Sequence, residues 1–144
     1  MTARNGSANW HGDVRTGAGT ITVGEGVFSG PYSYDSRFGE HQGTNPEQLI
    51  AAAQAGCFTM ALASKLATGG HPPELLRTNA TVHLRTRDVS ITLARLEIET
   101  EGRVKGIDEQ QFSQYAEDAK ATCPVARALS GIPEIELKAK LART

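Results

Sequence analysis

Hydrophobic residues change their spacing along the chain, and each change marks a new type of element. Up to about Tyr34, short apolar runs such as 19–23 and 32–34 are separated by turn residues, which predicts three short antiparallel strands. Residues 35–43 are polar and predict a loop. Between 79 and 104 apolar side chains recur at every second position, which predicts two more strands. The alternation slips between Leu93 and Leu96, which indicates a β-bulge.

A long helix is predicted between these two strand regions. Residues 44–47 combine a capping residue, a proline for the first helical position and a carboxylate for the first turn, and the helix ends near Thr68. Segment 49–67 is long enough to cross a bilayer. It contains Gln54 and Lys65, however, and its apolar residues are mostly alanine. We interpret it as a buried core helix and expect no membrane partner.

The last third predicts two helices and a closing strand. Residues 108–121 place aromatic and alanine side chains on one face of a helix, 122–124 interrupt it, and 125–129 form a further short helix. Residues 135–141 alternate as a half-buried strand does. The order βββ-α-ββ-αα-β predicts an α+β fold, and the absence of repeats or a linker predicts a single domain over 1–144.

This order has a consequence for assembly. A helix that is apolar nearly all round must be covered on every side, and six short strands are too few to enclose it. We therefore expect a homodimer that buries the helix between two chains.

The charge balance and the amino-terminal residues bear on the partners and the location of the protein. The chain has 144 residues, with 15 Lys and Arg balanced by 16 Asp and Glu and no basic run, which argues against a nucleic acid partner. Residues 1–12 are polar and lack an apolar stretch of signal-peptide length, so we expect a cytoplasmic protein.

The sequence contains two cysteines, Cys57 and Cys123, without CxxC or clustered Cys and His spacing. The four histidines are isolated from one another and from both cysteines, so we predict no metal site and no cofactor. A Cys-His hydrolase, with His41 or His83 as the base, stays open as an alternative.

The two cysteines differ in their surroundings. Cys57 lies in the middle of the long helix among small residues, and Cys123 directly precedes Pro124, where a new helix begins. Unpaired amides and the helix dipole at that position favour a thiolate. Alternatively, each thiol is a buried and inert side chain.

Several motifs together resemble the OsmC/Ohr family of hydroperoxide reductases. They are an Asn-Pro-Glu-Gln helix start, a cysteine ten residues beyond that glutamate, a second cysteine followed by proline, and a Trp-His-Gly-Asp opening; they occupy 45–48, 57, 123–124 and 10–13. Ser36-Arg37-Phe38, just ahead of the helix, resembles the OsmC branch. The Ohr branch carries its arginine near the amino terminus, where Arg15 is the candidate. The resemblance implies antiparallel sheets wrapped around a long central cysteine-bearing helix, in an intertwined homodimer.

The resemblance also implies a role for each site residue. Cys57 is the peroxidatic thiol and Cys123 the resolving thiol. Arg37 stabilises the thiolate and the peroxide, because its guanidinium stays protonated. Glu47 orients Arg37 through a bidentate ion pair. The substrate is an organic hydroperoxide, and the reductant is an external thiol such as a lipoyl dithiol.

Helix geometry places a condition on these roles. Ten residues of helix separate Glu47 from Cys57 by about 15 Å. If Glu47 supports the thiolate, it therefore acts across a dimer interface. Two alternatives remain: a redox-sensing or ligand-binding member of the same fold without rapid turnover, and a purely structural disulfide, which a cytosolic location argues against.

Overall fold

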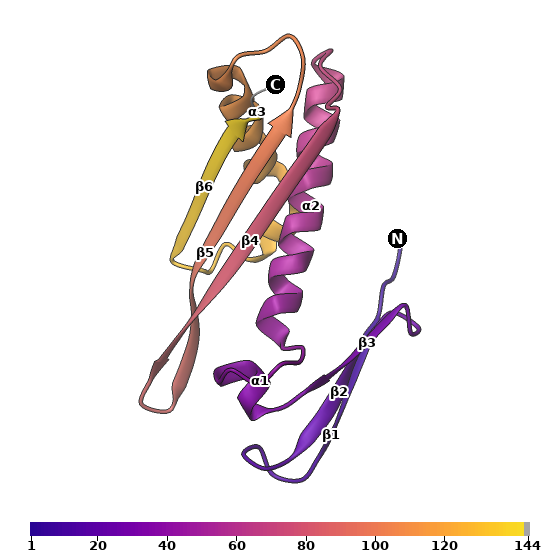
Figure 1. Cartoon of the computed structure of the whole chain (residues 1–144), viewed down its shortest axis with the longest axis vertical. Helices are drawn as coiled ribbons and strands as arrows, with labels where there is room; N and C mark the ends of the chain where they lie inside the picture. The colour runs from indigo at the N-terminus through magenta and orange to yellow at the C-terminus, as the bar shows by residue number, and fades with distance from the viewer. Residues whose placement is uncertain (143–144) are drawn as a thin grey trace. The chain divides into compact units, whose positions relative to one another are not determined.

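The computed structural model describes residues 1–142. The chain divides into two compact units, with the boundary between Leu49 and Ile50. Figure 1 shows a three-stranded sheet in each unit and one long helix that begins in the first unit and continues through the second. The predicted α+β class is confirmed.

The first unit begins with three antiparallel strands in sequential order. They are β1 (Gly6–His11), β2 (Ala18–Val23) and β3 (Phe28–Tyr32). The three predicted strands are confirmed, but the third ends before Tyr34. Tyr34 instead begins α1 (Tyr34–Phe38), a short helix within the segment that we predicted to be a loop. Ser33 and Ser36 form its capping box, since each side chain accepts a hydrogen bond from the other's backbone N–H.

Helix α2 (Pro46–Thr68) has the predicted limits. The Oδ1 atom of Asn45 accepts a hydrogen bond from the N–H of Gln48 at 2.8 Å and so caps the helix. At the other end, Gly70 adopts a φ of 88°, and the N–H of His71 returns to the carbonyl of Leu66 at 2.8 Å. A glycine is favoured at this terminus because the backbone there is left-handed.

The second unit contains a sheet in the order β4-β5-β6, made of β4 (Leu75–Arg87), β5 (Ser90–Arg103) and β6 (Glu134–Leu141). His83 pairs with Arg95 and Leu84 with Leu93, so Ala94 is the extra residue and the predicted bulge is confirmed. Strand β6 runs parallel to β5, whereas we expected antiparallel sheets. The connection between them explains this direction, because it crosses the sheet through two helices before the chain returns.

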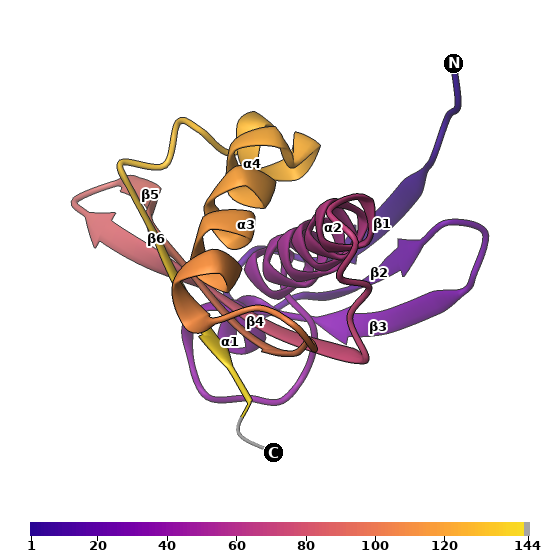
Figure 2. The same ribbon diagram turned by 90° about the horizontal axis from the view of Figure 1, so that it is seen from above.

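These two helices are α3 (Glu109–Thr122) and α4 (Pro124–Ala128). Figures 1 and 2 show α3 and the long helix α2 on the same face of the β4-β5-β6 sheet. The core between them is apolar and fully or nearly fully buried, and includes Phe58, Leu62, Leu66, Leu96, Ile98, Phe112, Ala116 and Ala119. Cys123 belongs to the same core.

A chain of hydroxyl groups fixes α2 against this sheet. The hydroxyls of Thr59 and Thr78 are hydrogen-bonded at 2.8 Å, and those of Thr78 and Thr100 are 3.0 Å apart. Because these polar groups are paired in an otherwise apolar layer, they hold the helix in one register on β4 and β5.

Candidate functional site

The two cysteines meet inside the second unit. Cys57 lies near the middle of α2 and is half-buried, whereas Cys123 is fully buried between α3 and α4. Their Sγ atoms are 3.1 Å apart, and both thiols are free. Residues 66 positions apart in the sequence are thus already in contact in the reduced protein.

Local sequence explains why Cys123 occupies this position. Its N–H donates to the carbonyl of Ala119 at 2.9 Å and closes α3, while its own carbonyl accepts from the N–H of Arg127 at 3.0 Å and opens α4. Its backbone is extended, with φ −63° and ψ 120°. Pro124 disfavours a helical conformation in the residue before it, which breaks the two helices at this thiol.

The surroundings of Cys57 oppose its ionisation. Burial raises the pKa of the Cys57 thiol above its ordinary value, and the hydrogen bond and charge of Cys123 raise it further. A hydrogen bond from the backbone N–H of Val125, in the first turn of α4, opposes the rise. We expected the free amides of this helix start to favour a thiolate on Cys123, but the amide of Val125 acts on Cys57. Within residues 1–142, none of the groups that shift this pKa is a cation.

A third side chain reaches the sulfur pair, and it belongs to none of the sequence motifs. Gln54 precedes Cys57 by one helical turn and is fully buried. Its Nε2 donates to Cys123 Sγ at 3.6 Å. Its Oε1 has no hydrogen-bond partner among the residues that the structure covers. The sequence feature that could have indicated Gln54 is a polar residue three positions before a cysteine, in a largely apolar stretch of helix.

The predicted arginine and glutamate form a pair in the first unit. Arg37 Nε lies 3.0 Å and 3.2 Å from the two carboxylate oxygens of Glu47, and Arg37 Nη2 lies 2.7 Å from Oε1. Glu47 is buried, whereas about a third of the Arg37 side chain is exposed. Asn45 holds the two residues in place, because its Nδ2 donates to the carbonyl of Ser36 at 2.9 Å. The guanidinium is therefore held in a fixed, bidentate geometry.

Arg15, the alternative arginine, is placed differently. Its guanidinium lies over the ring of Tyr34, 4.5 Å from the ring centre, as a cation–π contact. No ion pair joins Arg15 to a carboxylate in the described part of the chain. The pairing with Glu47 therefore favours Arg37 over Arg15 as the residue that Glu47 orients.

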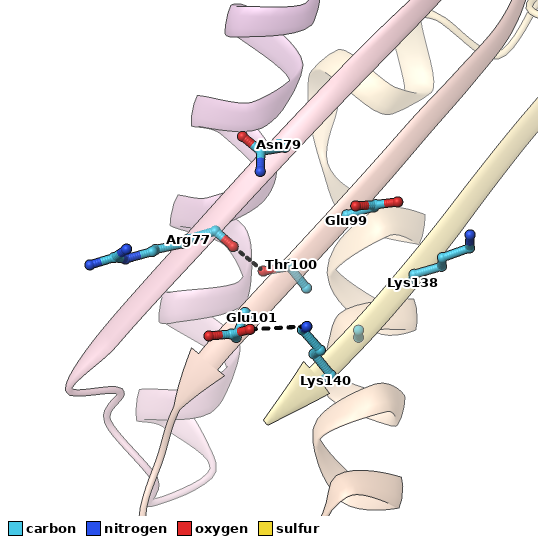
Figure 3. Close-up of a pocket in the computed structure, with 8 residues that line it drawn as sticks. Arg77, Asn79, Glu99, Thr100, Glu101, Lys138 and Lys140 are labelled. Carbon is cyan, nitrogen blue, oxygen red and sulfur yellow. Dashed lines mark hydrogen bonds and ion pairs between the residues drawn. The ribbon is translucent and has the colours of Figure 1, made fainter. Parts of the chain in front are cut away.

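The second unit also has a hollow in its surface. The hollow, of about 420 Å³, lies on the β4-β5-β6 sheet, and neither cysteine lines it. Figure 3 shows its lining residues. The hollow is lined mainly by charged side chains, among which Lys140 pairs with Glu101 at 3.2 Å. Over residues 1–142, no three His, Cys, Asp or Glu side chains form a cluster suited to a metal ion. Helix α2 has the length and composition to cross a membrane, a test that core helices of soluble proteins also pass.

Comparisons with known proteins show which family the chain belongs to. Residues 39–138 match the family model described as OsmC-like protein. The chain is 39% identical to peroxiredoxin OsmC of Escherichia coli over 127 residues, which cover 88% of this chain and 89% of that one. It is 33% identical to organic hydroperoxide resistance protein-like 1 of Staphylococcus saprophyticus over 67% of this chain and 68% of that one.

A solved structure shows the same fold. The crystal structure of an organic hydroperoxide resistance protein OsmC from Legionella pneumophila superposes with a TM-score of 0.69 at 21% identity, covering 99% of this chain and 100% of that one. The family model and the Escherichia coli relative each match well over half of this chain. The chain therefore belongs to the OsmC family.

Proposed function

We propose that this protein is a cysteine-based peroxidase that reduces organic hydroperoxides, with Cys57 as the peroxidatic thiol and Cys123 as the resolving thiol. The observation that carries the proposal is the 3.1 Å separation of a half-buried and a fully buried thiol. The more accessible sulfur meets the substrate, and the buried one lies within reach of the product formed on it. The names of the relatives, peroxiredoxin and organic hydroperoxide resistance protein, support this substrate class.

The proposed cycle begins with attack of the Cys57 thiolate on an oxygen of the hydroperoxide. The O–O bond breaks, an alcohol leaves after gaining a proton, and a sulfenic acid forms on Cys57. The Cys123 thiolate then attacks the sulfenic sulfur, hydroxide leaves as water, and the Cys57–Cys123 disulfide forms. An external thiol, which we propose to be a lipoyl dithiol, returns two electrons and two protons.

The Cys57 thiolate needs a cation, since burial raises the pKa of this thiol. We propose that Arg37 is this cation, that it also donates to the leaving alkoxide, and that Glu47 orients it. A guanidinium fixed by two or more hydrogen bonds to one carboxylate needs no reorganisation when charge develops beside it.

Assembly as a homodimer is part of the proposal. Only 22% of the most apolar stretch of α2 is buried in the single chain, and Met60 on this helix is 76% exposed. Ala52, Ala53 and Gly56 are also exposed and are small enough for a close approach of two helices. We propose that Arg37 and Glu47 of one chain serve Cys57 of the other, in a single-domain cytoplasmic enzyme of oxidative stress defence.

The first experiment compares wild type with Cys57→Ser. It follows the consumption of cumene hydroperoxide and of hydrogen peroxide, with dithiothreitol and then a lipoyl dithiol as reductant. Rapid consumption of the organic peroxide that vanishes in the variant supports the proposal. A single slow turnover per chain favours a redox-sensing or ligand-binding role instead, and turnover that survives Cys57→Ser rules the mechanism out.

Mixing two variants at neutral pH, where Cys57→Ser lacks the nucleophile and Arg37→Met has little thiolate, tests the shared site. In a mixture of Cys57→Ser and Arg37→Met chains, a mixed dimer has one site with both native residues only if Arg37 acts on the partner's Cys57. Random exchange then restores about a quarter of the wild-type sites. No recovery after verified exchange means that each site is built from one chain.

A further inference from the structure

Gln54 occupies a position that packing does not explain. The side chain is fully buried beside an apolar core, and its carbonyl oxygen Oε1 has no hydrogen-bond partner among the described residues. Burying an amide that is only half satisfied costs stability, whereas methionine or leucine would fill the same space without this cost. A polar group that weakens the core it occupies indicates a role in the chemistry beside it.

The contacts of Gln54 identify the atom on which it acts. Cys123 Sγ lies 3.6 Å from Gln54 Nε2 and 3.1 Å from Cys57 Sγ. The buried sulfur therefore has a hydrogen-bond donor on one side and its redox partner on the other. Gln54 and Cys57 are three residues apart in α2, so helix geometry places both on the face that Cys123 approaches.

We propose that Gln54 is a positioning residue for Cys123, whose sulfur it stabilises whenever that sulfur carries negative charge. The inference rests on the proposed thiol peroxidase cycle and assigns the residue that controls its two disulfide steps. A hydrogen bond from an N–H group to a thiolate is charge-assisted and stronger than the same bond to a neutral thiol.

Two steps place charge on Cys123. In the first, its thiolate attacks the sulfur of the Cys57 sulfenic acid, the S–O bond breaks, and hydroxide leaves as water. In the second, the thiolate of the reductant attacks Cys57 Sγ, the Cys57–Cys123 bond breaks, and its electron pair goes to Cys123 Sγ. The reductant is then bonded to Cys57 as a mixed disulfide, which its second thiol resolves to give a cyclic disulfide and reduced Cys57.

In the second step, the external thiol attacks one of the two disulfide sulfurs in preference to the other. A disulfide is cleaved faster when the leaving sulfur is the better stabilised thiolate. Gln54 gives Cys123 a donor that offsets the Val125 N–H at Cys57, and Cys57 is the more exposed of the two sulfurs, so an external thiol is directed to Cys57. The reductant therefore enters at the atom that the peroxide also meets, and Cys123 stays buried throughout the cycle.

The test separates the steps in Gln54→Met, which keeps the length of the side chain and removes the N–H donor. The rate constant for peroxide with Cys57 is expected to stay within about twofold of wild type, while disulfide formation and reduction by dithiothreitol each slow by about tenfold. Trapping with dimedone should reveal a longer-lived sulfenic acid. The thermal midpoint should be unchanged or higher, because the orphaned carbonyl is gone.

Two further variants keep the result decisive. Thr59→Val removes another polar group from α2, a half-buried hydroxyl that bonds to Ala55 and Thr78 and not to sulfur, so its disulfide rates should match wild type. Gln54→Leu also lacks the donor and leaves no polar group against the sulfur. It should slow both steps at least as much, and it provides the measurement if Gln54→Met does not fold.

The results also distinguish the two proposals. Disulfide prepared with diamide allows the reduction rate to be measured whether or not the protein turns over peroxide. Absence of peroxide turnover in wild type contradicts the proposed function alone. Reduction of the Gln54 variants at the wild-type rate overturns the role of Gln54, and so does an equal loss in every step accompanied by a lower thermal midpoint.

Discussion

The Sγ atoms of Cys57 and Cys123 lie 3.1 Å apart while both thiols are reduced. A disulfide bond is about 2.05 Å long, so its formation moves the two sulfurs by only about 1 Å. Neither α2 nor the junction of α3 and α4 has to unfold for this approach. The resolving step of the proposed cycle is therefore limited by the chemistry at sulfur rather than by a change of fold.

Cys123→Ser is expected to retain one turnover and lose the rest. Cys57 still attacks the peroxide, but its sulfenic acid has no second thiol within reach. Rapid mixing with cumene hydroperoxide should consume about one equivalent per chain, and dimedone should label Cys57, as detected by mass spectrometry. Undiminished steady-state turnover would show that an external thiol, and not Cys123, resolves the sulfenic acid.

Arg37→Met is expected to shift the pH dependence of peroxide reduction upward. Burial raises the pKa of the Cys57 thiol, so without a cation its reactive thiolate is lost as the pH falls toward neutral and gained as the pH rises. The rate constant of the variant should still be rising at alkaline pH, where wild type has levelled off. Arg15→Met is the matched control and should follow wild type. Identical profiles for wild type and Arg37→Met would exclude Arg37 as the cation.

Glu47→Gln is expected to lower the rate constant for peroxide by about tenfold, because the amide replaces a bidentate carboxylate and leaves the guanidinium less well oriented. Steady-state kinetics at saturating reductant measure this effect. Glu40→Gln removes an exposed carboxylate of the same unit and should leave the rate unchanged. Equal losses in the two variants would point to net charge instead of orientation.

Gly102→Ala is expected to destabilise the second unit by about 1–3 kcal/mol. A Cβ atom at Gly102 would lie 2.6 Å from the ring of Phe112 and 3.1 Å from a methyl group of Leu76, so α3 would have to move away from β5. Chemical denaturation gives the change in the free energy of unfolding. Gly131→Ala meets no atom within 4 Å and is the control. A loss of similar size at Gly131 would contradict the packing explanation.

The sequence predicted regular elements well where periodicity or capping chemistry was strong. The start of α2 followed from Asn45 and Pro46, its end followed from Gly69 and Gly70, and the bulge at Ala94 followed from the slip in alternation around it. Helix α1 was missed because five residues cannot show a helical period, and its capping box uses a second serine at Ser36 where glutamate or glutamine is usual. The direction of β6 depends on where the crossover returns, which no local pattern encodes.

The candidate site was only partly visible in the sequence. Cys57, Cys123, Arg37 and Glu47 stand in motifs, and the structure pairs Cys57 with Cys123 and Arg37 with Glu47. Gln54 has no motif of its own, and its contact with Cys123 joins positions 69 residues apart. Contacts of this kind depend on tertiary packing, so side-chain identity along one helix does not reveal them.

The position of Cys123 at the break between α3 and α4 also affects how the chain resists unfolding. The proposed Cys57–Cys123 disulfide would join this break to the middle of α2 and close a loop of 66 residues. A cross-link of this span restricts the unfolded chain and favours the folded state by about 4 kcal/mol. When reducing thiols are depleted, the disulfide form of the protein would therefore accumulate. This form would resist unfolding better than the reduced form until a thiol reduces it again.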